Sequence, residues 1–144
     1  MIDDSTEDAA LTQIALKDIG VESRFNIVTD GIEALSYLRQ EPPHEAATMP
    51  DMILLDINLP MISGIETLAR IRSDPNLTAI PVIMLTTSSA ESDIARCYGL
   101  HANCYIVKPA TFDEYVEIGK AIINFWFAVS SLPKTLSPSR TKSN

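Results

Sequence analysis

Two short and almost continuous apolar runs constrain the fold more than any other feature of this sequence. They are Asp51–Asp56 (DMILLD) and Pro81–Thr86 (PVIMLT), each bounded by proline or polar residues. Runs of this length without apolar–polar alternation are typical of parallel strands buried on both faces. Phe25–Thr29 (FNIVT) and Cys104–Lys108 (CYIVK) are two further strand candidates. The sequence therefore predicts a parallel sheet with both faces covered.

Segments with helical spacing of apolar residues separate these strands. They cover about 11–19, 31–39, 64–73, 91–100 and 112–131. Ser63 and Thr111 are expected to cap the third and the last of them, and Asp74-Pro75 to end the third. Repeated alternation of strand and helix implies right-handed crossovers between parallel strands. We therefore expect an α/β fold, a doubly wound five-stranded parallel sheet with helices on both faces.

The composition narrows the class of protein. The chain has 144 residues, of which 46% are hydrophobic, and this suits one globular domain. Its net charge of −8 argues against nucleic acid, whose phosphates would be repelled. No apolar run approaches the ~20 residues that span a bilayer, and the acidic N-terminal residues are unlike a secretory signal. We expect a cytoplasmic protein with no nucleic acid or membrane partner, a domain over 1–131 and a flexible tail over 132–144. The two cysteines, Cys97 and Cys104, are expected to be free thiols, with a disulfide as the alternative.

Polar side chains follow four of the predicted strands at their carboxyl ends. They are Asp3 and Asp4, Asp56, Thr86 and Lys108. Functional sites of open parallel sheets gather at this edge. Each residue has an ordinary alternative role: Asp3 or Asp4 could cap the first helix, Asp56 could be a plain strand-end residue, and Lys108 could extend to solvent. Their joint occurrence favours a shared site.

The chemistry that such an edge supports is phosphoryl transfer. Clustered carboxylates repel one another until a cation lies among them, and Mg²⁺ prefers oxygen ligands. Asp3 and Asp4 are expected to hold Mg²⁺, and Asp56, which ends the longest buried run, is expected to be the nucleophile. Thr86 and Lys108 are expected to hold the phosphoryl oxygens.

Three segments, LLDINLPMISG, PVIMLTTS and YIVKP, follow the early acidic pair and resemble the receiver domain of two-component response regulators. The resemblance covers nearly the whole chain and implies a flavodoxin-like fold with strand order 2-1-3-4-5. It implies that Asp56 is the phosphoacceptor and that Asp4 and Asp56 ligate Mg²⁺. Asp3 would contribute mainly through water, and Asn58 through its backbone carbonyl.

The same resemblance assigns residues to a switch. Thr86 and Tyr105 match the pair that couples phosphorylation to a change of surface, in which the threonine moves inward and the aromatic ring follows. The alternative for Tyr105 is an exposed strand residue with no switching role. Lys108 matches the lysine that contacts the phosphoryl group, and the peptide bond before Pro109 is expected to be cis.

A narrower resemblance concerns the partner. SDPNLTAIPVIMLTTS, HANCYIVKP and NFWFAVSSLP look like the stand-alone regulators that partner bacterial phytochrome histidine kinases. This implies a sensor histidine kinase as phosphodonor and an output through protein contact. Phe125, Trp126 and Phe127 are consecutive and cannot all face one side of a helix. At least one is expected to point outward and to serve a kinase interface or a homodimer.

Two other classes of function remain open. A phosphatase of the haloacid-dehalogenase type needs a second aspartate two residues after the nucleophile, where this chain has Asn58. A receiver-like interaction domain that no longer switches is the other alternative. We expect a phosphoacceptor signalling protein with at most slow self-dephosphorylation, and not an enzyme.

The first strand is expected to be truncated. Only Met1 and Ile2 precede the acidic pair, which at ~3.3 Å per residue is under about 10 Å of strand. Three alternatives follow: residues precede Met1 in the native protein, the short strand is tolerated at a cost in stability, or another chain fills the gap. We favour the first of these.

Overall fold

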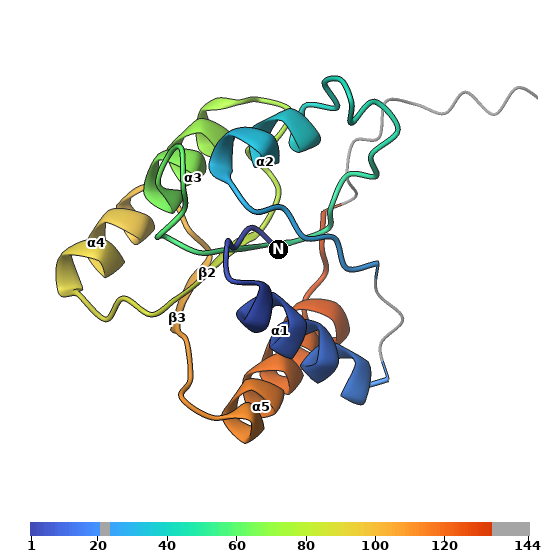
Figure 1. Ribbon diagram of the computed structural model, residues 1–144, viewed down its shortest axis with the longest axis vertical. Coiled ribbons are helices and arrows are strands. Elements are labelled where there is room, and N and C mark those ends of the chain that lie inside the picture. Colours follow the sequence, from blue (N-terminus) through green and yellow to red (C-terminus); the bar gives the residue numbers. More distant parts are fainter. Residues whose placement is uncertain (21–23, 134–144) are drawn as a thin grey trace, which may run out of the picture.

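Helices cover both faces of a parallel sheet in the computed structural model, which describes residues 1–20 and 24–133 (Figure 1). The strands are β1 (Ile53–Leu55), β2 (Val82–Thr86) and β3 (Cys104–Val107). The helices are α1 (Thr6–Asp18), α2 (Gly31–Leu38), α3 (Gly64–Ser73), α4 (Glu91–Gly99), α5 (Phe112–Ile123) and the π-helix η1 (Asn124–Val129). Most of the predicted tail, from residue 134 on, lies outside the described residues.

The sheet confirms the expected α/β fold. Its three strands are parallel in the order β1-β2-β3. Ile2 adds single-residue parallel bridges to Leu55 of β1 and to Val28. Across the sheet, the order is therefore Val28, Ile2, β1, β2 and β3, which matches the predicted order 2-1-3-4-5. The two predicted strands at Val28 and Ile2 are each reduced to a single bridging residue. The regular strand predicted over 25–29 is absent from this part of the structure, because Ile2 gives it only one residue to pair with.

The short first strand is fully hydrogen-bonded where it exists. The Ile2 amide donates to the Leu54 carbonyl at 2.8 Å, and the Asp56 amide donates to the Ile2 carbonyl at 3.0 Å. On the other side, the Asp3 amide donates to the Val28 carbonyl at 3.0 Å. These bonds place Asp3 and Asp56 at the same edge of the sheet.

Helix starts follow their capping residues. Ser63 accepts from the Glu66 amide and Thr111 from the Glu114 amide, as the sequence predicts. The first helix begins earlier than expected, because Ser5 caps it by accepting from the Asp8 amide. Asp3 and Asp4 therefore do not have the capping role that was their alternative. At the C-terminal end, the α-helix changes to the π-helix at Asn124.

Two apolar layers enclose the sheet. The larger one packs β1 and β2 against α2, α3 and α4, and the smaller one packs the other face of the sheet against α5. Every residue of β2 is buried. Figure 1 shows α2 and α3 on one side of the strands and α1 and α5 on the other. Both cysteines are free thiols, as expected. Within the described ranges, no helix is long and apolar enough to cross a bilayer.

Candidate phosphoacceptor site

Three carboxylates meet at the carboxyl edge of the sheet, as the sequence predicts. Asp3 follows the bridge at Ile2, and Asp56 follows β1. One oxygen each from Asp3, Asp4 and Asp56 lies within 4.8 Å of the others. Asp3 and Asp56 are buried and Asp4 is exposed, so the group opens to solvent on one side. Three oxygens at this spacing fit a hard divalent cation.

The Asp56 carboxylate is fixed at both oxygens. Its Oδ1 accepts from the Ile57 amide at 2.7 Å, and its Oδ2 accepts from Lys108 Nζ at 3.0 Å. The side chain is 7% exposed, so little of the carboxylate contacts solvent. The carboxylate is therefore held in one orientation before any ligand arrives.

Lys108 lies at the centre of the site. Its Nζ is within 2.7–3.0 Å of one oxygen each of Asp3, Asp8 and Asp56. Burial alone would lower the pKa of this ammonium, but its close contacts with the three carboxylates outweigh burial and raise the pKa above its ordinary value. Lys108 is therefore charged throughout the physiological range.

Of the two buried carboxylates, Asp3 has fewer hydrogen bonds than Asp56. Its Oδ1 accepts from the Ser5 amide at 2.9 Å. Its Oδ2 is 2.8 Å from Lys108 Nζ but has no well-aligned hydrogen bond. Burial raises the pKa of Asp3, and the neighbouring ammonium does not offset this. A buried carboxylate oxygen without a hydrogen bond is a strong ligand for an added cation.

Asp8 belongs to the site although the sequence analysis missed it. Its Oδ2 lies 2.7 Å from Lys108 Nζ, and its Oδ1 accepts from the Tyr115 hydroxyl at 3.3 Å. Burial opposes the charged form of Asp8, but Lys108 outweighs it and lowers the pKa. Burial and the charge of Asp8 raise the pKa of Tyr115 to about 12. A helix start at Ser5 puts Asp8 in the first turn of α1, but it puts Glu7 there as well, so the sequence held no signal that singles out Asp8.

The expected switch residues are joined through one loop. Thr86 ends β2, is fully buried, and accepts at Oγ1 from the Ser88 amide at 3.4 Å. Tyr105 on β3 is half-buried against the larger apolar layer and donates to the Ser88 carbonyl at 2.8 Å. Tyr105 is thus not an exposed strand residue, which was its alternative.

Two further expectations concern Asn58 and the peptide bond before Pro109. Asn58 is exposed just after the Asp56–Ile57 pair, near the acidic group. The prediction of a cis peptide bond before Pro109 is wrong. In the part of the chain that the structure describes, the cis bond is the one between Pro42 and Pro43.

Comparisons with known proteins agree with this geometry. Residues 1–119 match the response regulator receiver domain. Response regulator Rcp1 of Synechocystis sp. is 38% identical over 133 residues, which cover 92% of this chain and 90% of Rcp1. The crystal structure of the phosphorylated cyanobacterial phytochrome response regulator RcpA has a TM-score of 0.88 and 46% identity, over 92% of this chain and 94% of RcpA.

The Mn²⁺-bound form of Rcp1 is similar as well, with a TM-score of 0.86 and 38% identity, over 92% of this chain and 95% of that one. The narrower resemblance to phytochrome-associated regulators is thereby confirmed, as is the resemblance to receiver domains in general. The chain therefore belongs to the response regulator receiver domain family, whose members accept phosphoryl groups in two-component signalling.

Proposed function

We propose that this chain accepts a phosphoryl group on Asp56 from a phosphohistidine of a sensor histidine kinase. The observation that carries the proposal is the contact of Asp56 Oδ2 with the Lys108 ammonium at 3.0 Å, beside the acidic group of Asp3 and Asp4. An oriented carboxylate next to a fixed positive charge is suited to attack phosphorus.

The transfer conserves atoms and electrons. A carboxylate oxygen of Asp56 forms a bond to phosphorus, the bond from phosphorus to the donor nitrogen breaks, and the electron pair stays on that nitrogen. Lys108 then neutralises charge on the phosphoryl oxygens, and the buried hydroxyl of Thr86 donates to one of them. Loss of the phosphoryl group to water is slow and self-catalysed, so the chain is a signalling protein rather than an enzyme.

Mg²⁺ is the proposed cofactor. The side chains of Asp3, Asp4 and Asp56 and the backbone carbonyl of Asn58 would hold it, and it would neutralise charge on the transferred group. Asp3 Oδ2, buried and without a hydrogen bond, supports a cation at this place. The Mn²⁺-bound form of the relative Rcp1 supports a divalent ion.

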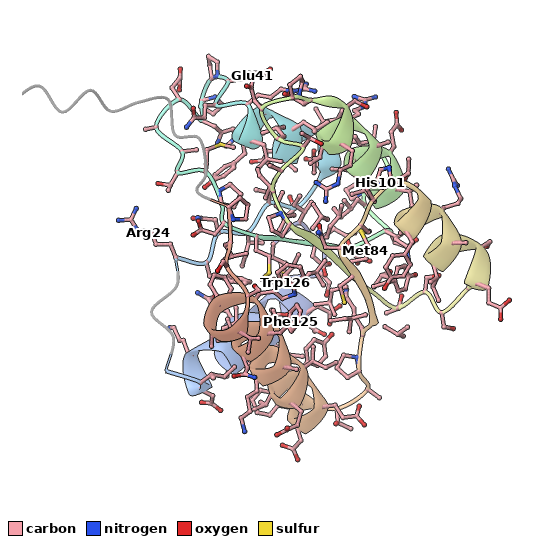
Figure 2. The ribbon with its side chains drawn as sticks, turned by 180° about the vertical axis from the view of Figure 1, so that it is seen from behind. Arg24, Glu41, Met84, His101, Phe125 and Trp126 are labelled. Carbon is pink, nitrogen blue, oxygen red and sulfur yellow. The ribbon has the colours of Figure 1, made fainter. Side chains whose placement is uncertain are left out.

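The proposed partners follow from the relatives and from the surface. RcpA is a cyanobacterial phytochrome response regulator, which supports a phytochrome histidine kinase as the donor in the cytoplasm. The net charge of −8 argues against nucleic acid. Phe125 and Phe127 are exposed in η1. Trp126, between them in the sequence, packs against the smaller apolar layer, and Figure 2 labels Phe125 and Trp126 on this helix. We assign the two exposed rings to a homodimer whose formation responds to the Thr86–Tyr105 switch.

Labelling by a small phosphodonor tests the assignment of the acceptor. Acetyl phosphate with Mg²⁺ is expected to add one phosphoryl group to the wild-type protein and none to Asp56→Asn, read by intact mass. Asp51→Asn is the matched control, because Asp51 is exposed and precedes β1, at the opposite end of that strand from Asp56. Labelling of Asp56→Asn would refute the assignment of Asp56 as the phosphoacceptor.

The proposed homodimer is tested by measuring the molecular mass of the protein in solution with and without a phosphoryl mimic. A dimer that forms equally well in both conditions would favour a non-switching interaction domain.

A further inference from the structure

The shortest contact of the Lys108 ammonium is to a carboxylate that the proposed chemistry leaves without a role. Nζ lies 2.7 Å from Asp8 Oδ2, compared with 2.8 Å from Asp3 Oδ2 and 3.0 Å from Asp56 Oδ2. The Lys108 side chain is only 4% exposed, so these carboxylates replace most of its hydration. Asp8 is thus a main partner of the lysine and not a surface charge near it.

Asp8 is held by two helices rather than by the sheet. Its amide donates to Ser5 Oγ at 3.2 Å, and its carbonyl accepts from Thr12 Oγ1 at 2.8 Å within α1. The Tyr115 hydroxyl of α5 donates to its Oδ1. Thr12 and Tyr115 are both buried. The Asp8 carboxylate can therefore keep its position while ligands enter and leave at the strand ends.

The three partners of Lys108 differ in what phosphorylation does to them. Among the described residues, the carboxylates that could hold a metal ion are Asp3, Asp4 and Asp56. Asp8 is not one of them. A cation on Asp3 and a phosphoryl group on Asp56 would each remove a partner from the ammonium. Lysine has a long flexible side chain, so an ammonium that loses its hydrogen-bond partners is no longer held in one position.

Asp8 is the partner that remains. An ammonium has three N–H donors, so one bond to Asp8 leaves two for the phosphoryl oxygens. We propose that Asp8 is a positioning residue that keeps Lys108 aimed at Asp56 while its other carboxylate partners are exchanged for the phosphoryl group. This inference rests on the proposed role of Asp56 as phosphoacceptor.

The first test is the rate of phosphorylation by acetyl phosphate at saturating Mg²⁺. Asp8→Asn is expected to slow it about tenfold, the effect of losing one charge-assisted hydrogen bond. The Mg²⁺ dissociation constant is expected to stay within about twofold of wild type, since Asp8 lies outside the metal group. Glu7→Gln is the matched control: it removes the same charge from the same helical turn at an exposed residue, and should change neither quantity.

The second test asks whether Asp8 acts through the lysine. Binding of beryllofluoride, a phosphoryl mimic, is measured by ¹⁹F NMR in wild type, Asp8→Asn, Lys108→Ala and the double variant. Asp8→Asn should weaken binding about tenfold in the wild-type background and less than about twofold beside Lys108→Ala. Asp8→Glu keeps the charge and should retain more of the rate than Asp8→Asn, which keeps the test available if the asparagine variant does not fold.

Three outcomes would overturn the inference. They are an unchanged rate in Asp8→Asn, equal weakening of beryllofluoride binding in both lysine backgrounds, and a large loss of Mg²⁺ affinity, which would make Asp8 a metal ligand. Labelling of Asp56→Asn would refute the proposed function instead, whatever the Asp8 variants do.

Discussion

The close approach of Gly64 to the backbone of Asp56 and Ile57 affects both the stability of the fold and the geometry of the candidate site. Gly64 begins α3 directly behind the phosphoacceptor strand, and its amide donates to the Ile57 carbonyl at 2.7 Å. A Cβ placed on Gly64 would overlap the Asp56 carbonyl oxygen and would lie 2.7 Å from both the Asp56 carbonyl carbon and Ile57 Cα. All three atoms are backbone, so no side chain can rotate away to make room.

Gly64→Ala is therefore expected to be strongly destabilising. An ordinary contact between heavy atoms is about 3.5 Å, and the overlap with the Asp56 carbonyl oxygen is the most severe of the three, so the start of α3 must move by more than about 1 Å relative to Asp56. Overpacking of this kind costs up to about 3 kcal/mol. At 2–4 °C for each kcal/mol in a chain of this size, the melting temperature should fall by up to roughly 6–12 °C. The same displacement shifts the Asp56 carboxylate from Lys108, so acetyl phosphate labelling should also slow.

Gly99→Ala is the matched control. Gly99 is the last residue of α4, and a Cβ there would meet nothing within 4 Å. Alanine is a better helix former than glycine by about 0.5–1 kcal/mol, so this variant should melt at or above the wild-type temperature. Thermal unfolding followed by circular dichroism measures both variants. A Gly64→Ala protein that melts within 1 °C of wild type and labels at the wild-type rate would refute the argument (taking about 1 °C as the error of the method).

Two further predictions concern Asp8 and the N-terminal strand. The pKa of Asp8 is lowered by folding from an ordinary value of 3.8, so its ion pair stabilises the protein above that pH and is lost as the pH falls through the lower, folded value. Asp8→Asn should therefore reduce the unfolding free energy by about 1 kcal/mol at pH 7 and by nothing once Asp8 is protonated, as urea titrations at several pH values can measure. Apolar residues added before Met1 are expected to raise the melting temperature and the Mg²⁺ affinity, because a cavity of about 400 Å³ lies beside Met1 and Ile2 between Val28 and Leu54. No gain in either would count in favour of a tolerated short strand.

Local signals in the sequence predicted most of the fold. The buried runs at β1 and β2, the caps at Ser63 and Thr111, and the meeting of Asp3 with Asp56 all follow from short segments and from the rule that sites lie at strand ends. A strand, however, needs a neighbour long enough to pair with it. The apolar pattern of Phe25–Thr29 is strand-like, but only Val28 finds a partner.

The contact between Asp8 and Lys108 was the part of the site that sequence patterns did not reveal. Asp8 and Lys108 are 100 residues apart, and their contact depends on how α1 packs against α5, whose Tyr115 also contacts Asp8. In the sequence, Asp8 is one of several acids in a polar segment, and nothing distinguishes it from the exposed Glu7. Only the fold separates a carboxylate that points at the lysine from one that points at solvent.

The charges around Lys108 favour a cation at this site. Asp3, Asp4, Asp8 and Asp56 bring four carboxylates to one ammonium, which leaves a formal charge of −3 when all are ionised. The lysine already contacts three of the carboxylates, and the fourth, Asp4, faces solvent. A phosphodonor is itself an anion and would be repelled by this charge. A divalent cation among Asp3, Asp4 and Asp56 would reduce the formal charge to −1 and would release Lys108 from Asp3 and Asp56 toward the incoming phosphoryl group. The arrangement therefore favours metal binding before phosphoryl transfer, with Asp8 as the contact that Lys108 retains in both states.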